Sequence, residues 1–464
     1  MAELQCDYLV VGAGAVGMSF VDTLLDESDA SVVMVDKQHL PGGHWNDAYP
    51  FVRLHQPSHF YGVRSTELGS RRVDQTGSNA GYYELATGNE VQSYFERVMR
   101  ERFLPSGRVQ YFPMSEYVGD NQFRNQLSGE VSSVQVAKRR VDSRYFEPSV
   151  PSRHQKNYAV SSDVLCVAPN RLPHLAGQHA NFCIIGAGKT AMDAAVWLLD
   201  NGADPDSVSW VCPRHSWMIN REVTQASAEF FKETIGGFAA QMQALAEATS
   251  VEDLFARLES CGFMLRIDQG QQPEMFHYAT ISTGEVEQLR RIGNVIQQGR
   301  VASIDSDGLT MANGDMIPMS ADTLYVDCSA SAIQFKHGSD RPVYAEDVIT
   351  IQPVRMPNPC LSASVSAFIE CRYDDDAKRN QLATPIPLPD DPQGFMRSTL
   401  GNMMNQVAWS NEPELREFVT ANRLDGFGAV IANADLSDPE NAAILEQMQR
   451  FAQPAVANLW KLLS

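Results

Sequence analysis

The sequence has no long uninterrupted apolar run and no closely spaced pair of cysteines. A membrane-spanning helix needs roughly 20 consecutive apolar residues, and the first residues lack the basic, apolar pattern of a secretory signal. The eight cysteines form neither C-x-x-C nor C-x-x-x-x-C, which argues against a dithiol redox centre and predicts reduced core thiols. We therefore expect a cytoplasmic protein with no membrane partner. No stretch has the spacing of a metal site, so no metal is expected.

Basic residues are also scarce, with 37 Lys and Arg against 57 Asp and Glu, a formal charge of −20. A surface of that sign repels phosphate backbones, which excludes nucleic acid as an expected partner. The 464 residues, 44% of them hydrophobic, are enough for two or three globular domains. The sequence does not indicate an oligomeric state.

A glycine-rich pattern lies near the start of the chain. An apolar run of buried-strand type leads into G-x-G-x-x-G, formed by Gly12, Gly14 and Gly17, and a second apolar run ends at Asp36. The glycines permit a tight turn, a close approach of the backbone to a pyrophosphate, and close packing of helix on strand. The acid stands where a carboxylate meets ribose hydroxyls. The pattern predicts an adenine dinucleotide with its pyrophosphate at a helix N-terminus. The alternative is an ordinary turn from a strand to a helix.

A second pattern of this kind begins at residue 181. Gly186, Gly188 and Ala191 occupy its three small positions, and the following strand ends near Arg214 instead of at an acid. A guanidinium offers a planar fork of donors to a 2′-phosphate, so this site is expected to prefer NADPH over NADH. The alternative is that Arg214 is a solvated surface arginine.

The loop after Asp36 contains Gly42, Gly43 and Trp45 in the order G-G-x-W. Here the sequence resembles the flavin-containing monooxygenases and their Baeyer-Villiger relatives, which have G-G-x-W at this distance from the first dinucleotide pattern. The resemblance implies that the first site binds FAD and that Trp45 contacts it. From the residues alone, Trp45 could equally be a core aromatic.

The resemblance continues through residues 53–61, a segment that runs past the flavin ring in these families. It implies a catalytic site formed by Arg53, His55 and Gln56, with Gln56 near the position of an asparagine at the reactive edge of the flavin. His55 has the alternative of a loop imidazole bonded to solvent.

A strand-like run at 323–330 contains Asp327 and stands where these flavoproteins have an Ala-Thr-Gly strand end. The resemblance implies that this run returns the chain to the FAD domain and that Asp327 contributes to the cofactor site. The similar run at 164–168 is expected to close the first part of that domain.

The expected fold is α/β, with two Rossmann-like dinucleotide-binding domains. The NADP domain is inserted in the FAD domain, and a helical tail follows. The FAD domain is expected at 1–172 and 322–372 and the NADP domain at 173–321, with a helical insertion at about 224–263. Residues 373–464 are expected to pack as helices on the FAD domain.

The resemblance implies an enzyme, an FAD-dependent oxidoreductase that uses NADPH. Its expected activity is that of a monooxygenase, which forms a C4a-peroxyflavin from molecular oxygen and oxygenates a small organic substrate. One family segment, F-x-G-x-x-x-H-x-x-x-[FY] before the second pattern, is not reproduced by His174 and His179. Two alternatives therefore remain open: a reductase or dehydrogenase that does not oxygenate, and a non-catalytic dinucleotide-binding sensor. The residues do not specify the substrate.

Overall fold

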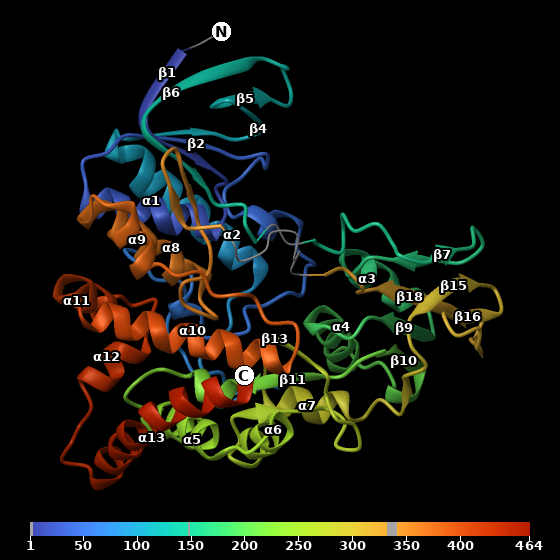
Figure 1. The fold of residues 1–464 in the computed structure, drawn as a ribbon. Coiled ribbons are helices and arrows are strands. Elements are labelled where there is room, and N and C mark those ends of the chain that lie inside the picture. Colours follow the sequence, from blue (N-terminus) through green and yellow to red (C-terminus); the bar gives the residue numbers. More distant parts are fainter. Residues whose placement is uncertain (1–2, 147–148, 332–340) are drawn as a thin grey trace.

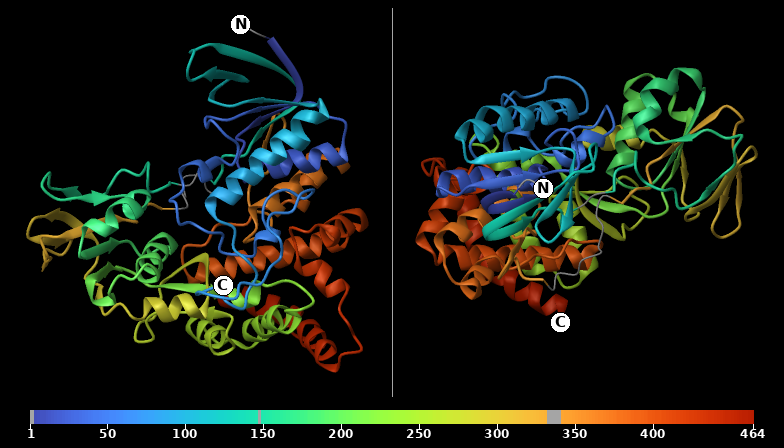
Figure 2. Two further views of the ribbon diagram at one scale, coloured as in Figure 1. Left: turned by 180° about the vertical axis from the view of Figure 1, so that it is seen from behind. Right: turned by 90° about the horizontal axis from the view of Figure 1, so that it is seen from above.

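A computed structural model describes residues 3–146, 149–331 and 341–464. The described chain forms two α/β units, each built on its own sheet, and a set of C-terminal helices (Figure 1). Seen from above, the second unit extends to one side of the first (Figure 2). The described residues include no helix that is both long and apolar enough to cross a membrane.

The first unit is built on an eight-stranded sheet whose main order is β19-β20-β6-β1-β2-β3. Strands β20, β6, β1, β2 and β3 are parallel, and β4 and β5 extend the sheet as an antiparallel meander. Helix α1 connects β1 to β2 and packs against α8. The bounds are β1 Glu3–Val11, α1 Ala15–Glu27, β2 Val32–Val35, α2 Gly88–Val98, β3 Val109–Phe112, β4 Ser115–Gly119, β5 Gln122–Asn125, β6 Val131–Asp142, β19 Tyr344–Ala345, β20 Val348–Thr350 and α8 Pro359–Arg372.

The second unit has a five-stranded, fully parallel sheet of order β14-β10-β9-β18-β8. Two smaller sheets, β12-β11-β13 and β17-β16-β15-β7, adjoin it. The bounds are β7 Ala159–Val160, β8 Cys166–Val167, α3 Leu172–Leu175, β9 Asn181–Ile185, α4 Lys189–Asp200, β10 Val208–Val211, β11 Ser216–Asn220, η8 Arg221–Thr224, β12 Met264–Leu265, β13 Met275–Ile281, α7 Thr283–Leu289, β14 Asn294–Ile296, β15 Val301–Asp305, β16 Gly308–Met311, β17 Met316–Pro318 and β18 Thr323–Asp327.

The predicted fold class is confirmed, since two α/β units with parallel sheets are present and the second lies between β6 and β19 of the first. Two strand placements were wrong. Strands β8 and β18, expected in the first unit, both belong to the second sheet, and Asp327 therefore lies opposite Ile185 of β9. The physical reason is that β1 is already paired along both edges, by β2 and by the long β6, so neither strand has an edge of β1 to join.

The remaining helices form two groups: α5 and α6 lie between β11 and β12, and α9 to α13 follow α8. Helices α5 and α6 form the helical insertion expected at about 224–263. The bounds are α5 Phe231–Glu247, α6 Val251–Ser260, α9 Asp376–Leu382, α10 Pro392–Ser410, α11 Pro413–Ala421, α12 Phe427–Ala432 and α13 Pro439–Leu463.

The C-terminal segment packs in two places, although the sequence indicated the first unit alone. Leu382 of α9 and Phe418 of α11 join the core of the first unit. Phe395 of α10 and Leu459 of α13 join a different cluster, which includes Leu254 of α6, and α13 lies along α5 (Figure 1). The tail therefore connects the first unit to the helical insertion of the second.

Candidate functional site

The first glycine-rich loop connects β1 to α1. Gly12 has φ +106°, which a residue with a side chain adopts only at a cost. A Cβ on Gly17 would lie 2.1 Å from the carbonyl oxygen of Gly12. Only glycine at these positions allows the helix to pack this close to the strand.

The loop at Gly42 and Gly43 lies directly against the start of α1. The N–H of Gly42 donates to the Ala13 carbonyl at 2.8 Å, and a Cβ on Gly43 would lie 3.0 Å from Cα of Gly14. Two backbones without side chains therefore meet at the N-terminus of α1, where the first N–H groups favour an anion. These residues fit a dinucleotide pyrophosphate.

Asp36 lies beside the same loop, just after β2, and is 7% exposed. Its Oδ2 accepts from the Ala13 N–H at 2.5 Å and its Oδ1 from the Gln38 N–H at 2.7 Å. Burial raises the pKa of this carboxyl, and the two N–H groups oppose that rise. The acid is thus held beside the loop, with both carboxylate oxygens bonded to backbone N–H groups.

Trp45 is a core residue of the first unit. Its side chain is 9% exposed, and its indole N–H donates to the hydroxyl of Tyr61 at 2.7 Å. The structure thus favours the alternative of a core aromatic, one that supports the Gly42–Gly43 loop from behind.

The second glycine-rich loop connects β9 to α4. Gly186 has φ +139°, and a Cβ there would lie 2.4 Å from the carbonyl oxygen of Cys328. Ala191 is fully buried, whereas a Cβ on Gly188 would meet no atom within 4 Å. The start of α4 is therefore open, and its residues fit a second dinucleotide.

Arg214 and Asp327 both lie near the second loop. Arg214 follows β10 and is exposed, with no hydrogen bond or ion pair of its guanidinium among the described residues. Asp327 is 2% exposed and accepts from the N–H and hydroxyl of Ser329 at 3.1 and 2.6 Å. Asp327 therefore lies at the end of β18, beside the second loop and not in the first unit.

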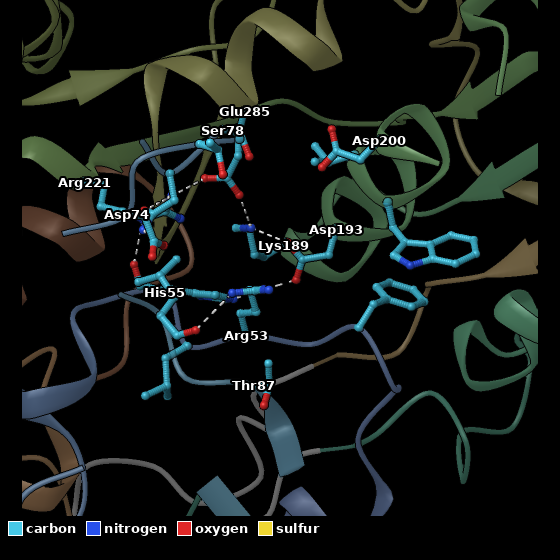
Figure 3. A pocket seen from close by; sticks show the side chains of 18 of the residues that line it. Arg53, His55, Asp74, Ser78, Thr87, Lys189, Asp193, Asp200, Arg221 and Glu285 are labelled. Atoms are coloured by element: carbon cyan, nitrogen blue, oxygen red, sulfur yellow. Dashed lines mark hydrogen bonds and ion pairs between the residues drawn. The ribbon is translucent and has the colours of Figure 1, made fainter. Parts of the chain in front are cut away.

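A cavity of about 490 Å³ lies between the two units. One side comes from the loop between β2 and α2 of the first unit, and the other from α4, η8 and α7 of the second (Figure 3). It is lined by Pro50, Phe51, Arg53, Leu54, His55, Asp74, Thr76, Gly77, Ser78, Asn79, Leu85, Thr87, Lys189, Asp193, Val196, Trp197, Asp200, Asn201, Arg221 and Glu285.

Four charged side chains form a network on the cavity wall (Figure 3). Lys189 bonds Asp193 within α4 and reaches Oε1 of Glu285 at 2.9 Å, and Arg221 contacts Oε2 of Glu285 at 2.6 Å. The hydroxyl of Tyr49 donates to Asp193 at 2.6 Å. Two cations and two carboxylates balance, which is the arrangement that buried charge requires.

The network sets the ionisation of its members. Burial alone would raise the pKa of Glu285, but Lys189 and Arg221 outweigh it and hold that pKa well below its usual range. Burial would lower the pKa of Lys189, but Asp193 and Glu285 raise it above its usual value. Both side chains are therefore charged at neutral pH.

Two of the three predicted catalytic residues line this cavity. Arg53 donates to the carbonyl of Leu85 at 3.4 Å, and the Nε2 of His55 lies 4.0 Å from Asp193. Burial and the nearby Lys189 lower the pKa of His55 to about 4, so its imidazole is neutral at pH 7. Gln56 is half-buried and is not among the lining residues.

The sequence analysis missed Lys189, Asp193 and Glu285 as site residues. Signals for two of them were present. Lys189 stands inside the second glycine pattern, and Glu285 follows Ser282 in a capping box, where it accepts from the Ser282 N–H at 2.9 Å. Nothing local indicated that the two side chains would meet.

The described residues contain no group of His, Cys, Asp or Glu able to hold a metal ion. None of the eight cysteines forms a disulfide.

The fold and the two loops define a class: an α/β protein with two dinucleotide-type loops and a charged cavity between the units that contain them. No family model matches the sequence. The chain is 44% identical over 422 residues to uncharacterized proteins of Mycobacterium tuberculosis (strain ATCC 25618 / H37Rv) and Mycobacterium bovis. The matched region covers 91% of this chain and 78% of each relative. It belongs to the same family as these mycobacterial proteins.

The chain is also similar to three solved structures, each with a TM-score of 0.47. They are a flavin-containing monooxygenase from Stenotrophomonas maltophilia (12% identity, 80% of this chain and 98% of that chain), cyclohexanone monooxygenase in an open form (14%, 92% and 97%) and the polycyclic ketone monooxygenase of Thermothelomyces thermophila (12%, 100% and 88%). They include a flavin-containing monooxygenase, the kind of protein that the sequence resembles.

Proposed function

We propose that the protein is an FAD-dependent oxidoreductase that uses NADPH, and that it acts as a monooxygenase on a small organic substrate. The observation that supports this proposal is the pairing of two glycine-rich loops of dinucleotide type, one in each unit, with a charged cavity between the units. A protein that binds one dinucleotide needs one such loop, so the presence of two supports two bound dinucleotides.

FAD is assigned to the first loop. The N-terminus of α1, where Gly14 meets Gly43, would bind its pyrophosphate through backbone N–H groups, and Asp36 its ribose. When bound, FAD would supply the chemistry of hydride acceptance and reaction with oxygen, which no side chain of the protein supplies.

NADPH is assigned to the second loop. Gly188 leaves the start of α4 open for a pyrophosphate, and the exposed Arg214 stands after β10, where a 2′-phosphate would lie. Charge-assisted, bidentate bonding by a guanidinium would select the phosphorylated coenzyme.

The cavity between the units is assigned to the substrate and the reactive end of the coenzyme. Phe51 and Trp197 stack on its wall with centroids 5.2 Å apart, which provides an apolar surface. Lys189, from α4, and the neutral imidazole of His55, from the loop between β2 and α2, provide donors in the same cavity. An organic molecule with one apolar part and one polar group would be oriented by these two surfaces.

A reductase that does not oxygenate is the second candidate. The position of Gln56 favours it, since the side chain expected to stabilise an oxygenated flavin does not line the cavity. The two candidates share both cofactors and differ only in the fate of the electrons.

One experiment separates them, starting from protein purified without added cofactor. Its visible spectrum and the nucleotides released on denaturation test for FAD, and NADPH oxidation is then followed with and without oxygen. A monooxygenase oxidises more than one equivalent of NADPH per flavin only when oxygen is present, and it incorporates oxygen into a substrate. A reductase passes electrons anaerobically to an added acceptor. Protein that contains no flavin after reconstitution contradicts both assignments and leaves the sensor.

A further inference from the structure

Arg423, in the turn between α11 and α12, bonds only to backbone and hydroxyl oxygens. Its guanidinium donates to the carbonyls of His59 at 2.5 Å, Tyr61 at 3.1 Å and Thr66 at 2.5 Å, and its Nε donates to Arg64 at 3.1 Å. It also bonds the carbonyl of Val63 and contacts the hydroxyl of Tyr94 at 3.4 Å. No carboxylate lies within 4.0 Å of it among the described residues.

This bonding suits arginine and no other side chain. A guanidinium presents five N–H groups in a rigid plane, which lets it meet several carbonyls of one curved segment at the same time. The carbonyls all come from residues 59–66, so the C-terminal segment holds this part of the first unit through one side chain. A lysine has three donors on one atom and cannot span them.

The segment that Arg423 holds is connected to the first glycine-rich loop through side-chain contacts. Arg423 bonds the backbone of Tyr61, and the hydroxyl of Tyr61 accepts from the indole of Trp45 at 2.7 Å. Trp45 closely follows Gly43, whose backbone contacts Gly14 at the start of α1. A displacement of residues 59–66 would therefore move the loop that lies over the dinucleotide position.

Close packing fixes the turn that carries Arg423. Gly426 has φ +65°, and a Cβ there would lie 2.3 Å from the ring of Phe60. Asn358, which caps α8, donates to the carbonyl of Leu424 at 2.7 Å. The turn that carries Arg423 is thus held on both sides, by α8 and by the ring of Phe60.

We propose that Arg423 is a positioning residue of the FAD site and that the C-terminal segment, which lies outside both glycine-rich loops, controls how tightly FAD is held. The inference rests on the proposed assignment of FAD to the first loop. It gives residues 373–464 a role in that site.

The test compares Arg423→Lys with the wild type and with Arg416→Lys, a matched change at an exposed position of α11. Two quantities are measured: the FAD dissociation constant of the apoprotein, and the amide hydrogen exchange of residues 57–66. Loss of bonds from a charged group predicts a rise in the dissociation constant of about 10-fold to 100-fold in Arg423→Lys. Exchange of 59–66 should increase in the same variant, and Arg416→Lys should change neither quantity.

Tyr61→Phe separates positioning from general stability. It removes the acceptor of Trp45 and leaves the carbonyls bound to Arg423 intact. FAD binding should weaken and the flavin absorption band should change shape, while exchange of 59–66 stays as in the wild type.

The outcomes distinguish the inference from the function on which it rests. Unchanged FAD affinity in Arg423→Lys overturns the inference alone, and if that variant does not fold, unchanged affinity in Tyr61→Phe overturns it. A wild-type protein that binds no FAD overturns the proposed function and the link to FAD. The exchange of 59–66 then still decides whether Arg423 positions that segment.

Discussion

The Nζ of Lys189 lies 2.9 Å from Oε1 of Glu285. Lys189 is the first residue of α4, directly after the second glycine-rich loop, and Glu285 is in the first turn of α7. The lysine thus lines the cavity between the units, where its charge is paired with Asp193 and Glu285. This leaves Arg214 as the cation assigned to the coenzyme phosphate.

We expect Glu285→Gln to lower the free energy of unfolding by about 3 kcal/mol at pH 7, because it leaves Lys189 and Arg221 buried against one remaining carboxylate. The amide retains the shape of the capping residue, so the effect reports the charge. Urea unfolding measures it. The matched control is Glu247→Gln, whose carboxylate pairs with Arg257 at an exposed position and should contribute less than about 1 kcal/mol. Equal effects of the two changes would mean that the cavity network contributes little.

Gly14→Val should yield a folded protein that retains little FAD. The valine side chain would occupy the space where Gly14 meets Gly43 and where a pyrophosphate approaches the backbone. Flavin absorbance per protein after reconstitution is the measurement. Gly293→Val is the control, since a Cβ there meets no atom within 4 Å. A full complement of flavin in Gly14→Val would remove FAD from the first loop.

Arg214→Ala should raise the Michaelis constant for NADPH far more than that for NADH. Losing a charge-assisted bond to the 2′-phosphate costs about 1.5–3 kcal/mol, a factor of about 10 to 100. Steady-state oxidation of both coenzymes provides the comparison, with the exposed Arg300→Ala as the control. If both constants rise equally, Arg214 does not contact the 2′-phosphate.

The stability of the protein should fall between pH 7.5 and pH 5.5, in part because of His59. Its side chain is 5% exposed, and burial lowers its pKa from 6.5 to about 4. Below pH 6.5 the unfolded chain binds a proton that the folded protein does not, so the free energy of unfolding decreases as pH falls. For this group the decrease is about 1 kcal/mol over that range. Urea unfolding at both pH values should show a smaller decrease in His59→Gln, and an unchanged one would show that His59 titrates normally.

Gln56→Leu should increase the hydrogen peroxide released per NADPH oxidised if Gln56 donates to the oxygenated cofactor. Gln56 does not line the cavity. Peroxide and NADPH are quantified together in aerobic turnover, with His55→Gln as the comparison, since His55 does line the cavity. An unchanged ratio in Gln56→Leu together with stoichiometric peroxide in the wild type supports the reductase.

The sequence by itself determined the two glycine-rich loops. A positive φ at Gly12 and Gly186, and the contact of Gly17 with the Gly12 carbonyl, are local demands that only glycine satisfies. Asp36 is equally local, since the end of a strand beside such a loop fixes its place. Fold class followed from these features because each loop requires a strand before it and a helix after it.

Only the tertiary structure decided which strand joined which sheet. The runs that form β8 and β18 are apolar and short, and nothing within them specifies a partner. Their sheet was set by which strand edges remained unpaired, and the edges of β1 were already filled by β2 and β6. For that reason Asp327 lies in the second unit, although the sequence indicated the first.

The charged cavity and the position of Arg423 were likewise tertiary. Lys189 and Glu285 are 96 residues apart, and Arg423 and Tyr61 are 362 apart. A sequence shows that such residues can be charged or can donate, but the burial that makes them pair depends on the packing of distant elements. The same packing places Trp45 in the core, where it supports the loop, although the sequence indicated a contact with the cofactor.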